Sequence, residues 1–127
     1  KIVPLSSFMQ VLIGGNPTIC SYQADCSNFL SVDADGSVYV CGRSVGVQGR
    51  KIGNIIEQDF DRILKEERYL SIRRDMTNLP AGCRVCEWLA VCNGGCPLHR
   101  DEGGKYLLCD AVRIILPEMK RVVNKYL

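Results

Sequence analysis

Eight cysteines carry the chemistry that this sequence can do, and their spacing suits metal ligation. Four of them fall within residues 83–96, in the pattern Cys-x2-Cys-x5-Cys-x3-Cys followed by proline. Thiols this close in sequence can converge on one small volume, and thiolates are the soft ligands that iron–sulfur clusters and zinc prefer. The count suits two four-iron clusters or two zinc sites made of cysteine alone. The eight are Cys20, Cys26, Cys41, Cys83, Cys86, Cys92, Cys96 and Cys109.

The main alternative for eight cysteines in a short chain is a scaffold of four disulfides. Three features argue against it. The sequence has no secretory signal segment. Its 46% of hydrophobic residues can build a core without cross-links. Cys-x2-Cys next to Cys-x3-Cys-Pro is a spacing typical of metal chelation. Reduced thiols that bind metal in turn predict a reducing compartment, the cytoplasm.

Composition limits the partners that the chain can have. A length of 127 residues suits one domain. The net charge of +2 is too small to predict binding to nucleic acid or to an anionic membrane, and no apolar run reaches the ~18 residues of a membrane-spanning helix. Because the chain begins at Lys1 rather than Met, we expect a fragment of a longer protein or a processed one. We predict that residues 1–19 are a connecting segment with a short helix, the end of an upstream domain, and that residues 20–127 form the metal-binding domain.

The cysteines need short elements of both kinds to position them, and the predicted fold class is α+β. We expect a small, irregular, cysteine-rich domain with a β-hairpin, Cys-rich knuckle loops and a C-terminal helix. Residues 29–32 and 38–40 favour strands and flank an Asp-Ala-Asp-Gly turn, which predicts the hairpin and a positive φ at Gly36. Cys41 closes the second strand, and the Gly-rich segment 42–54 is predicted to be loop.

Three stretches carry helical signals. A short helix is expected at 8–13, with serine before it as N-cap and glycines after it. One or two amphipathic helices are expected between 55 and 75, with Asn54 as N-cap and a turn at 77–82 after them. The last helix is expected to open at Cys109, and a proline further along would kink it or start a second helix. Its predicted buried stripe is Ala111, Ile114, Ile115, Met119, Val122, Val123 and Tyr126.

The knuckle, residues 83–97, contains a natural local trio of ligands. A cubane cluster needs four thiolates, of which a tight loop supplies two or three and a distant residue completes the set. In bacterial two-cluster ferredoxins, the last cysteine of a Cys-x3-Cys-Pro ending ligates the other cluster. By that analogy Cys96 could cross over to join the three upstream cysteines, and Cys109 could complete the trio. The trio is Cys83, Cys86 and Cys92.

Four neighbours of these cysteines are expected to shape the site. Gly94 and Gly95 lack a Cβ, so the backbone can approach a cluster and its N–H groups can point at sulfur. Such hydrogen bonds tune a reduction potential. Trp88 and Leu89 lie inside the knuckle, where they could wall a cluster from water or simply pack in the core.

With these residues in place, the sequence resembles the SPASM domain, the C-terminal auxiliary-cluster domain of many radical S-adenosylmethionine enzymes. The family pattern is Cys, nine to fifteen residues, Gly, four residues, Cys, a gap, Cys-x2-Cys-x5-Cys-x3-Cys, a gap and Cys. Here Cys26, nine residues, a glycine, four residues and Cys41 match the first part, and the knuckle followed by Cys109 matches the rest. The additional Cys20 resembles the eight-cysteine members, so the match spans residues 20–109.

The resemblance implies two 4Fe–4S clusters. Family members modify peptides or proteins, for example sulfatase maturases and thioether-forming peptide maturases. The chain would then be an electron-transfer and substrate-docking module of such an oxidoreductase. Its implied partners are a radical S-adenosylmethionine barrel domain, in the same chain or a separate one, and a peptide or protein substrate. The implied ligands are Cys20, Cys26, Cys41 and Cys96 for the first cluster, and Cys83, Cys86, Cys92 and Cys109 for the second.

Two departures from the family pattern bear on activity. The Cys-x3-Cys-x2-Cys motif that holds the catalytic cluster of such enzymes is absent. This chain alone is therefore not expected to cleave S-adenosylmethionine, and no catalytic residue is assigned. Sulfatase maturases carry an Asp directly after the third cysteine of the first set, as a proposed base, whereas Gly42 stands there in this chain. The difference disfavours a sulfatase substrate and favours peptide-maturase chemistry.

Other polar residues are better explained without catalysis or ligation. His99 is expected to have a surface or packing role, because eight cysteines already suffice as ligands. Asp33 and Asp35 suit the hairpin turn, and Asp110 suits the first turn of a helix. Cations near the expected first cluster would raise its reduction potential. These cations are Arg43, Arg50 and Lys51.

A structural zinc-binding interaction module is the second hypothesis, from another class of function. Zinc would use the same thiolates in tetrahedral sites and would do no redox chemistry. Local spacing in the knuckle barely separates the two hypotheses, whereas the register of all eight cysteines with the family favours iron. Zinc can also replace iron in such sites when clusters decay.

Overall fold

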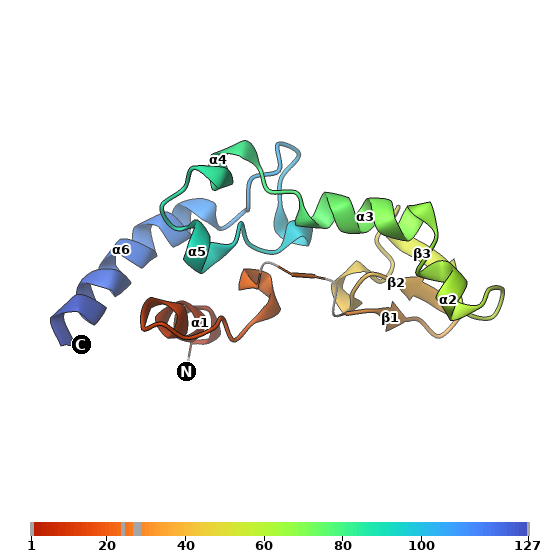
Figure 1. Ribbon diagram of the computed structural model, residues 1–127, viewed down its shortest axis with the longest axis horizontal. Helices are drawn as coiled ribbons and strands as arrows, with labels where there is room; N and C mark the ends of the chain where they lie inside the picture. The colour runs from red at the N-terminus through yellow and green to blue at the C-terminus, as the bar shows by residue number, and fades with distance from the viewer. Residues whose placement is uncertain (1, 24, 27–28, 127) are drawn as a thin grey trace. The chain divides into compact units, whose positions relative to one another are not determined.

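The structure, a computed structural model, describes residues 2–23, 25–26 and 29–126. The chain divides into two compact units, each described here by itself. The first unit combines residues 1–24 with 79–127, and the second unit is residues 25–78. Short helices and a three-stranded antiparallel sheet confirm the predicted α+β class (Figure 1).

The second unit is built on the sheet, whose strands lie in the order β1-β2-β3. The hairpin is confirmed: β1 pairs antiparallel with β2, with Val32 opposite Val38. Gly36 has the expected positive φ of 80°, which an L side chain rarely adopts. The strands are β1 (Ser31–Val32), β2 (Ser37–Tyr39) and β3 (Lys51–Asn54).

The third strand corrects the prediction that residues 42–54 are loop. β3 pairs antiparallel with β2 and buries Ile52, which is 1% exposed. Gly53 lies within this strand. A larger residue would not fit there, because a Cβ would lie 2.8 Å from the Ile63 side chain. Glycine inside a strand weakens the sequence signal for that strand, so the residues of β3 alone do not predict it.

Two helices cover this unit's apolar core, as the periodicity between 55 and 75 predicts. They are α2 (Phe60–Ile63) and α3 (Glu67–Thr77). Asn54 is not their N-cap. It ends β3, where its side-chain oxygen accepts the N–H of Ile56 and its amide donates to the carbonyl of Asp35. The buried core consists of Val38, Val40, Ile52, Ile63, Ile72 and Met76.

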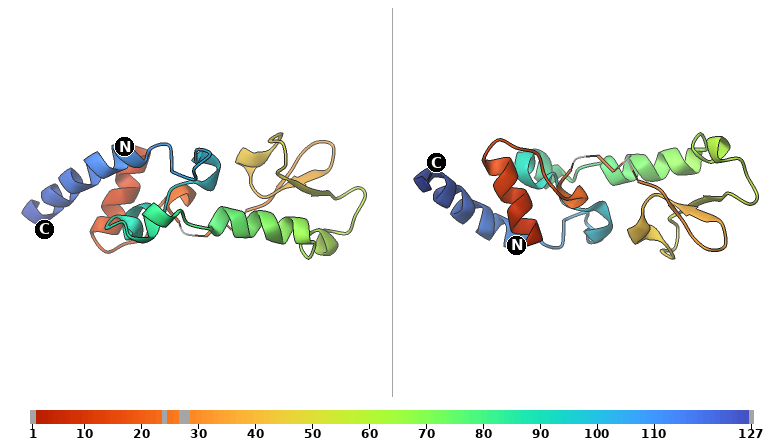
Figure 2. Two further views of the ribbon diagram at one scale, coloured as in Figure 1. Left: turned by 90° about the horizontal axis from the view of Figure 1, so that it is seen from above. Right: turned by 90° about the horizontal axis from the view of Figure 1, so that it is seen from below.

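The first unit packs α1 against α5 and α6, which Figures 1 and 2 show side by side. The N-terminal helix begins earlier than predicted, at Val3, because Pro4 suits a first turn. Ser7 is therefore not an N-cap but a buried residue whose hydroxyl accepts the N–H of Thr18. The helix ends before Gly14, as expected. The helices are α1 (Val3–Leu12), α4 (Ala81–Arg84), α5 (Leu89–Cys92) and α6 (Cys109–Tyr126), and the 3-10 turns are η1 (Cys20–Tyr22) and η3 (Pro97–His99).

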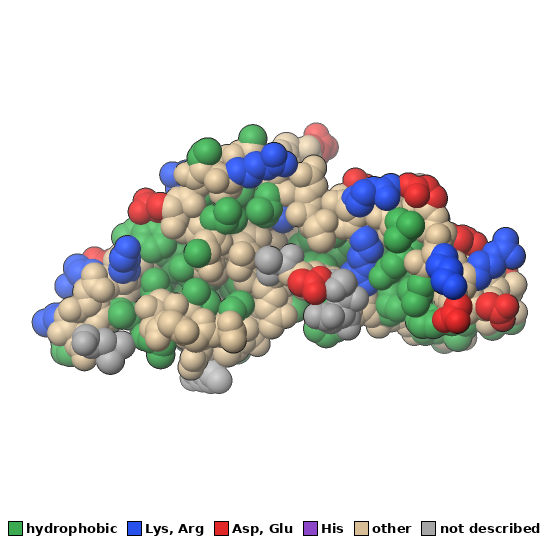
Figure 3. All heavy atoms as spheres, viewed as in Figure 1, with side chains coloured by type: hydrophobic (Ala, Val, Ile, Leu, Met, Phe, Trp, Pro, Cys, Tyr) green, Lys and Arg blue, Asp and Glu red, His purple; other side chains and the backbone are tan. Residues whose placement is uncertain are grey.

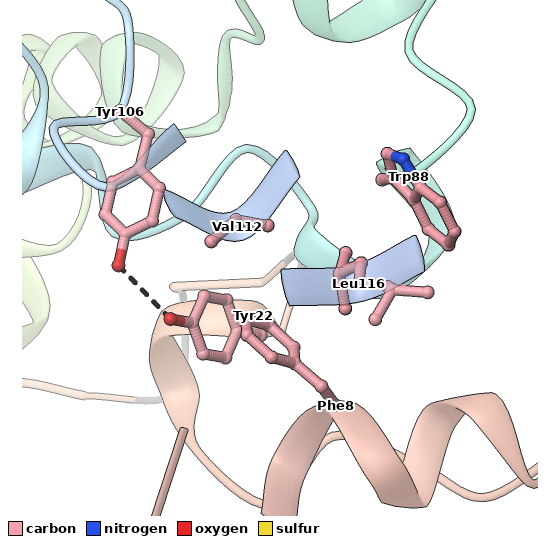
Figure 4. Packing of buried hydrophobic residues seen from close by; sticks show 7 residues of the cluster. Phe8, Tyr22, Trp88, Tyr106, Val112 and Leu116 are labelled. Carbon is pink, nitrogen blue, oxygen red and sulfur yellow. Dashed lines mark hydrogen bonds between the residues drawn. The ribbon is translucent and has the colours of Figure 1, made fainter. Parts of the chain in front are cut away.

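Aromatic side chains join these helices into one core (Figure 4). The rings of Phe8 and Tyr22 lie 4.4 Å apart, centroid to centroid. The hydroxyls of Tyr22 and Tyr106 lie 3.3 Å apart. Val112 and Leu116 complete the core from α6. The knuckle therefore has more regular structure than predicted, because α5 and its flanks pack against this core.

The last helix opens at Cys109 as predicted and runs without a break through Pro117. Its predicted buried stripe is only partly correct, since Met119 packs against the core whereas other members of the stripe are exposed. Val112 and Leu116 are the buried positions, whereas Ile114 is 74% exposed and Tyr126 is 72% exposed. The helix thus has an apolar face that the core of this unit does not cover. In the part of the chain that is described, no helix has the length and apolarity needed to cross a membrane.

Candidate metal centre

Four cysteines of the first unit line one cavity, namely Cys83, Cys86, Cys92 and Cys109. They are the three knuckle cysteines of the predicted local trio and the late cysteine predicted to complete it. Cys109 is distant from the knuckle in the sequence, but it is the first residue of α6, and the fold places it beside the knuckle. Cys96 is not among the described residues that line this cavity.

Short backbone elements position each of the four thiols. Cys83 lies in α4, where its N–H donates to the carbonyl of Pro80 at 2.9 Å. Cys86 follows in a turn closed by its N–H and the carbonyl of Cys83 at 3.1 Å. Cys92 is the last residue of α5 and Cys109 is the first residue of α6. A thiolate at a helix N-terminus is stabilised by the positive end of the helix dipole.

Left-handed backbone after α5 brings the chain close to the sulfurs. Asn93, Gly94 and Gly95 have φ values of 49°, 74° and 64°. A Cβ at Gly94 would lie 2.6 Å from Leu79 and 3.6 Å from the sulfur of Cys83. Position 94 therefore has room for the hydrogen of glycine but not for a Cβ. Asn93 secures the turn by donating from its side-chain amide to the carbonyl of Tyr22 at 2.7 Å.

The electrostatics of the cavity show that its thiols act on one another. Burial raises the pKa of Cys92 to about 11, the N–H groups of Gly94 and Gly95 oppose this rise, and Cys109 and Cys83 add to it. Burial also raises the pKa of Cys83, and Cys109 and Cys86 reinforce that direction. Burial thus favours the protonated form of Cys83 and Cys92, and binding of a metal group by these two thiols must release protons.

Apolar side chains close the cavity. Trp88, Leu89, Tyr106 and Val112 line it, and three of these four are also buried core residues of the first unit. The predicted core role of Trp88 is confirmed, since its indole packs in the core of the first unit (Figure 4). The same residue lines the cavity of the four thiols. An apolar wall excludes water and lowers the local dielectric constant, which influences redox potential.

The donor set consists of four soft thiols, which suit an iron–sulfur cluster. Within residues 2–23, 25–26 and 29–126, no group of three or more His, Cys, Asp or Glu side chains is arranged to hold a metal ion. Four thiols nevertheless surround one cavity, and a 4Fe–4S cube separates its four sulfur ligands more widely than one tetrahedral ion does. The residues present therefore fit a four-iron cluster.

The other four cysteines are divided between the units, and the structure describes each pair within its own unit. In the first unit, Cys20 opens η1 and is exposed, whereas Cys96 is 7% exposed and precedes Pro97 at the start of η3. Cys26 and Cys41 lie in the second unit and are half-buried.

In the second unit, a buried arginine holds the backbone beside Cys26. The guanidinium of Arg73, on α3, donates to the carbonyls of Cys26 and Phe29. It also lies over the ring of Tyr69, 5.1 Å from the centroid. The mixed charges of Arg73, Arg74 and Asp75 favour a solvated helix face, so the sequence does not predict this role. The position of Arg73 between Ile72 and Met76 along the helix was the only available signal.

Cys41 is held by a second local device. It is the N-cap of η2 (Gly42–Ser44), and its N–H donates to the hydroxyl of Ser44 at 3.1 Å. That hydroxyl donates in turn to the carbonyl of Cys41 at 2.7 Å. Ser44 is fully buried, so the loop around Cys41 has a fixed local geometry.

The remaining polar candidates have local partners. Asp35 accepts the N–H and the hydroxyl of Ser37, which lower the pKa of its carboxyl. Asp33 accepts the N–H of Ala34 in the same turn. Asp110 pairs with Lys105 at 2.8 Å, and this contact lowers the pKa of Asp110. His99 is exposed.

The profile of the SPASM family, described as an iron-sulfur cluster-binding domain, matches residues 20–87. The chain belongs to the SPASM family. The matched segment is more than half of the 127 residues. It confirms the resemblance predicted from the cysteine register, and with it the binding of iron–sulfur clusters.

Curated relatives of this SPASM domain are sulfatase-maturating enzymes. The cysteine-type anaerobic sulfatase-maturating enzyme of Clostridium novyi (strain NT) is 29% identical over 93 residues, which cover 73% of this chain and 25% of the relative. The serine-type enzyme of Bacteroides thetaiotaomicron is 30% identical over 89 residues, which cover 69% of this chain and 21% of the relative. The chain thus spans about a quarter of the length of these relatives.

Solved structures share the fold. One described as histidine-tagged anSMEcpe with bound AdoMet has a TM-score of 0.72 at 19% identity, and covers 98% of this chain and 35% of that chain. Another, native anSMEcpe with bound AdoMet and Cp18Cys peptide, has a TM-score of 0.71 at 20% identity, and covers 97% and 36%. At this level of identity, the likeness shows the SPASM fold alone.

Proposed function

We propose that this SPASM domain holds two 4Fe–4S clusters and serves electron transfer and substrate docking in a radical S-adenosylmethionine enzyme that modifies a peptide or protein. One observation carries the proposal: four cysteines from the knuckle and α6 line a single cavity in the first unit. The domain would comprise residues 20–127, with residues 1–19 as its connection to an upstream domain, and it would work in the cytoplasm.

The proposed ligands of the second cluster are Cys83, Cys86, Cys92 and Cys109. The proposed ligands of the first cluster are Cys20, Cys26, Cys41 and Cys96. The register of the cysteines with the family pattern supports both sets. For the second set, the shared cavity adds support. For the first set, the absence of Cys96 from the lining of that cavity agrees with its assignment elsewhere.

The chain's own residues would prepare the second site for electron transfer. When bound, a four-iron cluster accepts or donates one electron without bond breaking. The thiols of Cys83 and Cys92 must first lose protons, which their raised pKa values oppose. The N–H groups of Gly94 and Gly95 stabilise negative charge on the sulfur of Cys92, and Trp88 and Tyr106 exclude water.

A barrel domain would supply the S-adenosylmethionine chemistry, in the same chain or in a separate one. No Cys-x3-Cys-x2-Cys motif stands in this chain, and the solved relatives with bound AdoMet are longer than this chain. An apolar groove between α1 and α6 of the first unit offers a surface for such a partner (Figure 3). Its apolar lining is Ile2, Leu5, Met9, Ile114, Ile115, Met119 and Val122.

The proposed substrate is a peptide or protein, as in the sulfatase-maturating relatives and the solved complex with Cp18Cys peptide. Gly42 begins η2 directly after Cys41, at the position where a sulfatase maturase carries its proposed base. The proposal therefore covers peptide modification in general.

Anaerobic reconstitution tests the cofactor. We expect a brown protein with about eight irons and about eight sulfides per chain. A colourless protein with two zinc ions after anaerobic purification would instead indicate the structural zinc module. Aerobic samples are unsuitable for this test, since exposed clusters decay and zinc can enter their sites.

Single alanine variants test the two ligand sets. Cys96→Ala is expected to lower the first cluster's iron while the second cluster survives. Cys92→Ala, the matched control four residues away, is expected to do the reverse. Iron content with EPR spectra of the reduced proteins distinguishes the two losses. Selective loss of the second cluster in Cys96→Ala would show that the proposed crossover is wrong.

A further inference from the structure

Arg100 brings a positive charge to the cavity of the four cysteines. It follows η3, and its backbone forms an antiparallel bridge with Tyr106. The bridge fixes Arg100 beside a residue that lines the cavity. A Cβ added at Gly94 would lie 3.3 Å from Nη2 of Arg100 and 3.6 Å from the sulfur of Cys83. The guanidinium and the sulfur therefore border the same small space, which glycine leaves open.

The guanidinium of Arg100 lies near this sulfur. Nη2 of Arg100 and the sulfur of Cys83 both lie within 4 Å of the position that a Cβ on Gly94 would take. Asp110, the acidic residue in the first turn of α6, pairs with Lys105 at 2.8 Å. A second cation, Arg113, also lines the cavity. The half-buried guanidinium of Arg100 is thus placed to stabilise negative charge at Cys83.

We propose that Arg100 is a positioning and tuning residue that raises the reduction potential of the cluster bound by Cys83, Cys86, Cys92 and Cys109. The inference rests on the proposed function. A four-iron cluster with four thiolates has a formal charge of about −2, which becomes about −3 when one electron enters. A fixed cation stabilises the more negative state more strongly, because Coulomb energy grows with the charge product. No bond forms or breaks in this step.

Conservative and neutral substitutions separate charge from packing. Arg100→Lys keeps the charge and loses the planar fork, whereas Arg100→Gln keeps hydrogen-bonding capacity and loses the charge. Arg121→Gln is the matched control, since it removes the same charge from α6 of the same unit. Arg121 pairs with Glu118 and is twelve residues after Cys109, about 18 Å along the helix.

The test is a potentiometric titration of the reconstituted full chain with dithionite as the electron donor, monitored by EPR, after iron and sulfide have been counted. In Arg100→Gln, we expect the midpoint potential of one cluster to fall by at least about 59 mV, a tenfold change in a one-electron equilibrium constant. Arg100→Lys is expected to recover most of this shift. The other cluster and the Arg121→Gln variant should keep their wild-type potentials.

The outcomes separate the two levels of the proposal. A wild-type chain without iron and sulfide contradicts the proposed function. A wild-type chain with both clusters, together with an unchanged potential in Arg100→Gln, overturns the role of Arg100 alone. If Arg100→Gln loses iron, the midpoint potential is measured in Arg100→His instead. The imidazole of that variant loses its charge between about pH 5.5 and pH 8.5, so potentials with and without the charge are compared in one protein. A pH dependence equal to that of the wild type would then overturn the proposal.

Discussion

Single atoms decide the geometry of the knuckle, and glycine is required where the chain turns under the sulfurs. Gly95 has a φ of 64°. A Cβ there would lie 2.4 to 2.5 Å from ring atoms of Tyr106. This ring is buried and its hydroxyl lies 3.3 Å from that of Tyr22, so it cannot move away without disturbing the core.

Gly95→Ala is therefore expected to destabilise the first unit by about 1–3 kcal/mol, the usual cost of overpacking a core. Anaerobic urea denaturation measures the change in the free energy of unfolding. Gly82→Ala is the matched control. Gly82 lies in α4, and no atom lies within 4 Å of a Cβ added there. Its replacement is expected to be neutral or stabilising by up to about 1 kcal/mol. Equal losses in both variants would contradict the steric explanation.

At the scale of elements, helix α3 controls the loop that carries Cys26. Arg73 reaches from α3 to two backbone carbonyls of that loop, and its side chain is 9% exposed. A hydrogen bond to a charged group contributes about 1.5–3 kcal/mol. The next residue, Arg74, points to solvent and pairs with Glu67 on the same helix.

Arg73→Met is thus expected to destabilise the second unit by about 2–4 kcal/mol and to lower the iron content of the first cluster. The second cluster's iron should remain. Arg74→Met removes the same charge from an exposed pair and is expected to change stability by less than about 1 kcal/mol. Chemical denaturation followed by circular dichroism, with iron analysis, measures both effects. A similar response of the two variants would exclude a specific role of Arg73.

Patterns of residues predicted some elements well and others poorly, for identifiable reasons. The hairpin followed from its turn, since Gly36 needs a positive φ and the aspartates accept turn hydrogen bonds. The start of the last helix followed from Cys109 and Asp110. The third strand did not, because glycine interrupts it and its evidence is the long-range packing of Ile52.

The buried face of α6 could not be predicted from its periodicity. Apolar side chains occur on two faces of this helix, and the sequence does not say which face meets α1 and α5. The core took Val112 and Leu116, which left Ile114 exposed in the groove beside α1. The cysteines were found because ligand spacing is a local property, whereas Arg73 and Arg100 act through contacts that only the fold creates.

For the molecule as a whole, the two compact units divide the proposed ligands unequally. All four proposed ligands of the second cluster belong to the first unit, whereas Cys26 and Cys41 of the first set belong to the second unit. The two units also have separate hydrophobic cores. Assembly of the second cluster should therefore require only the core of the first unit.

Disruption of the second unit's core tests this division. Ile52 is 1% exposed in that core, and Ile52→Asp buries an unpaired charge, a change expected to cost more than about 4 kcal/mol. We expect this variant to lose the first cluster and to keep about four irons per chain, with the EPR spectrum of the second cluster intact. Val47→Asp is the matched control, because Val47 belongs to the same unit and is 44% exposed; it should keep about eight irons. Loss of all iron in Ile52→Asp would mean that the second site cannot form unless both units are folded, and the independence inferred from the separate cores would be wrong.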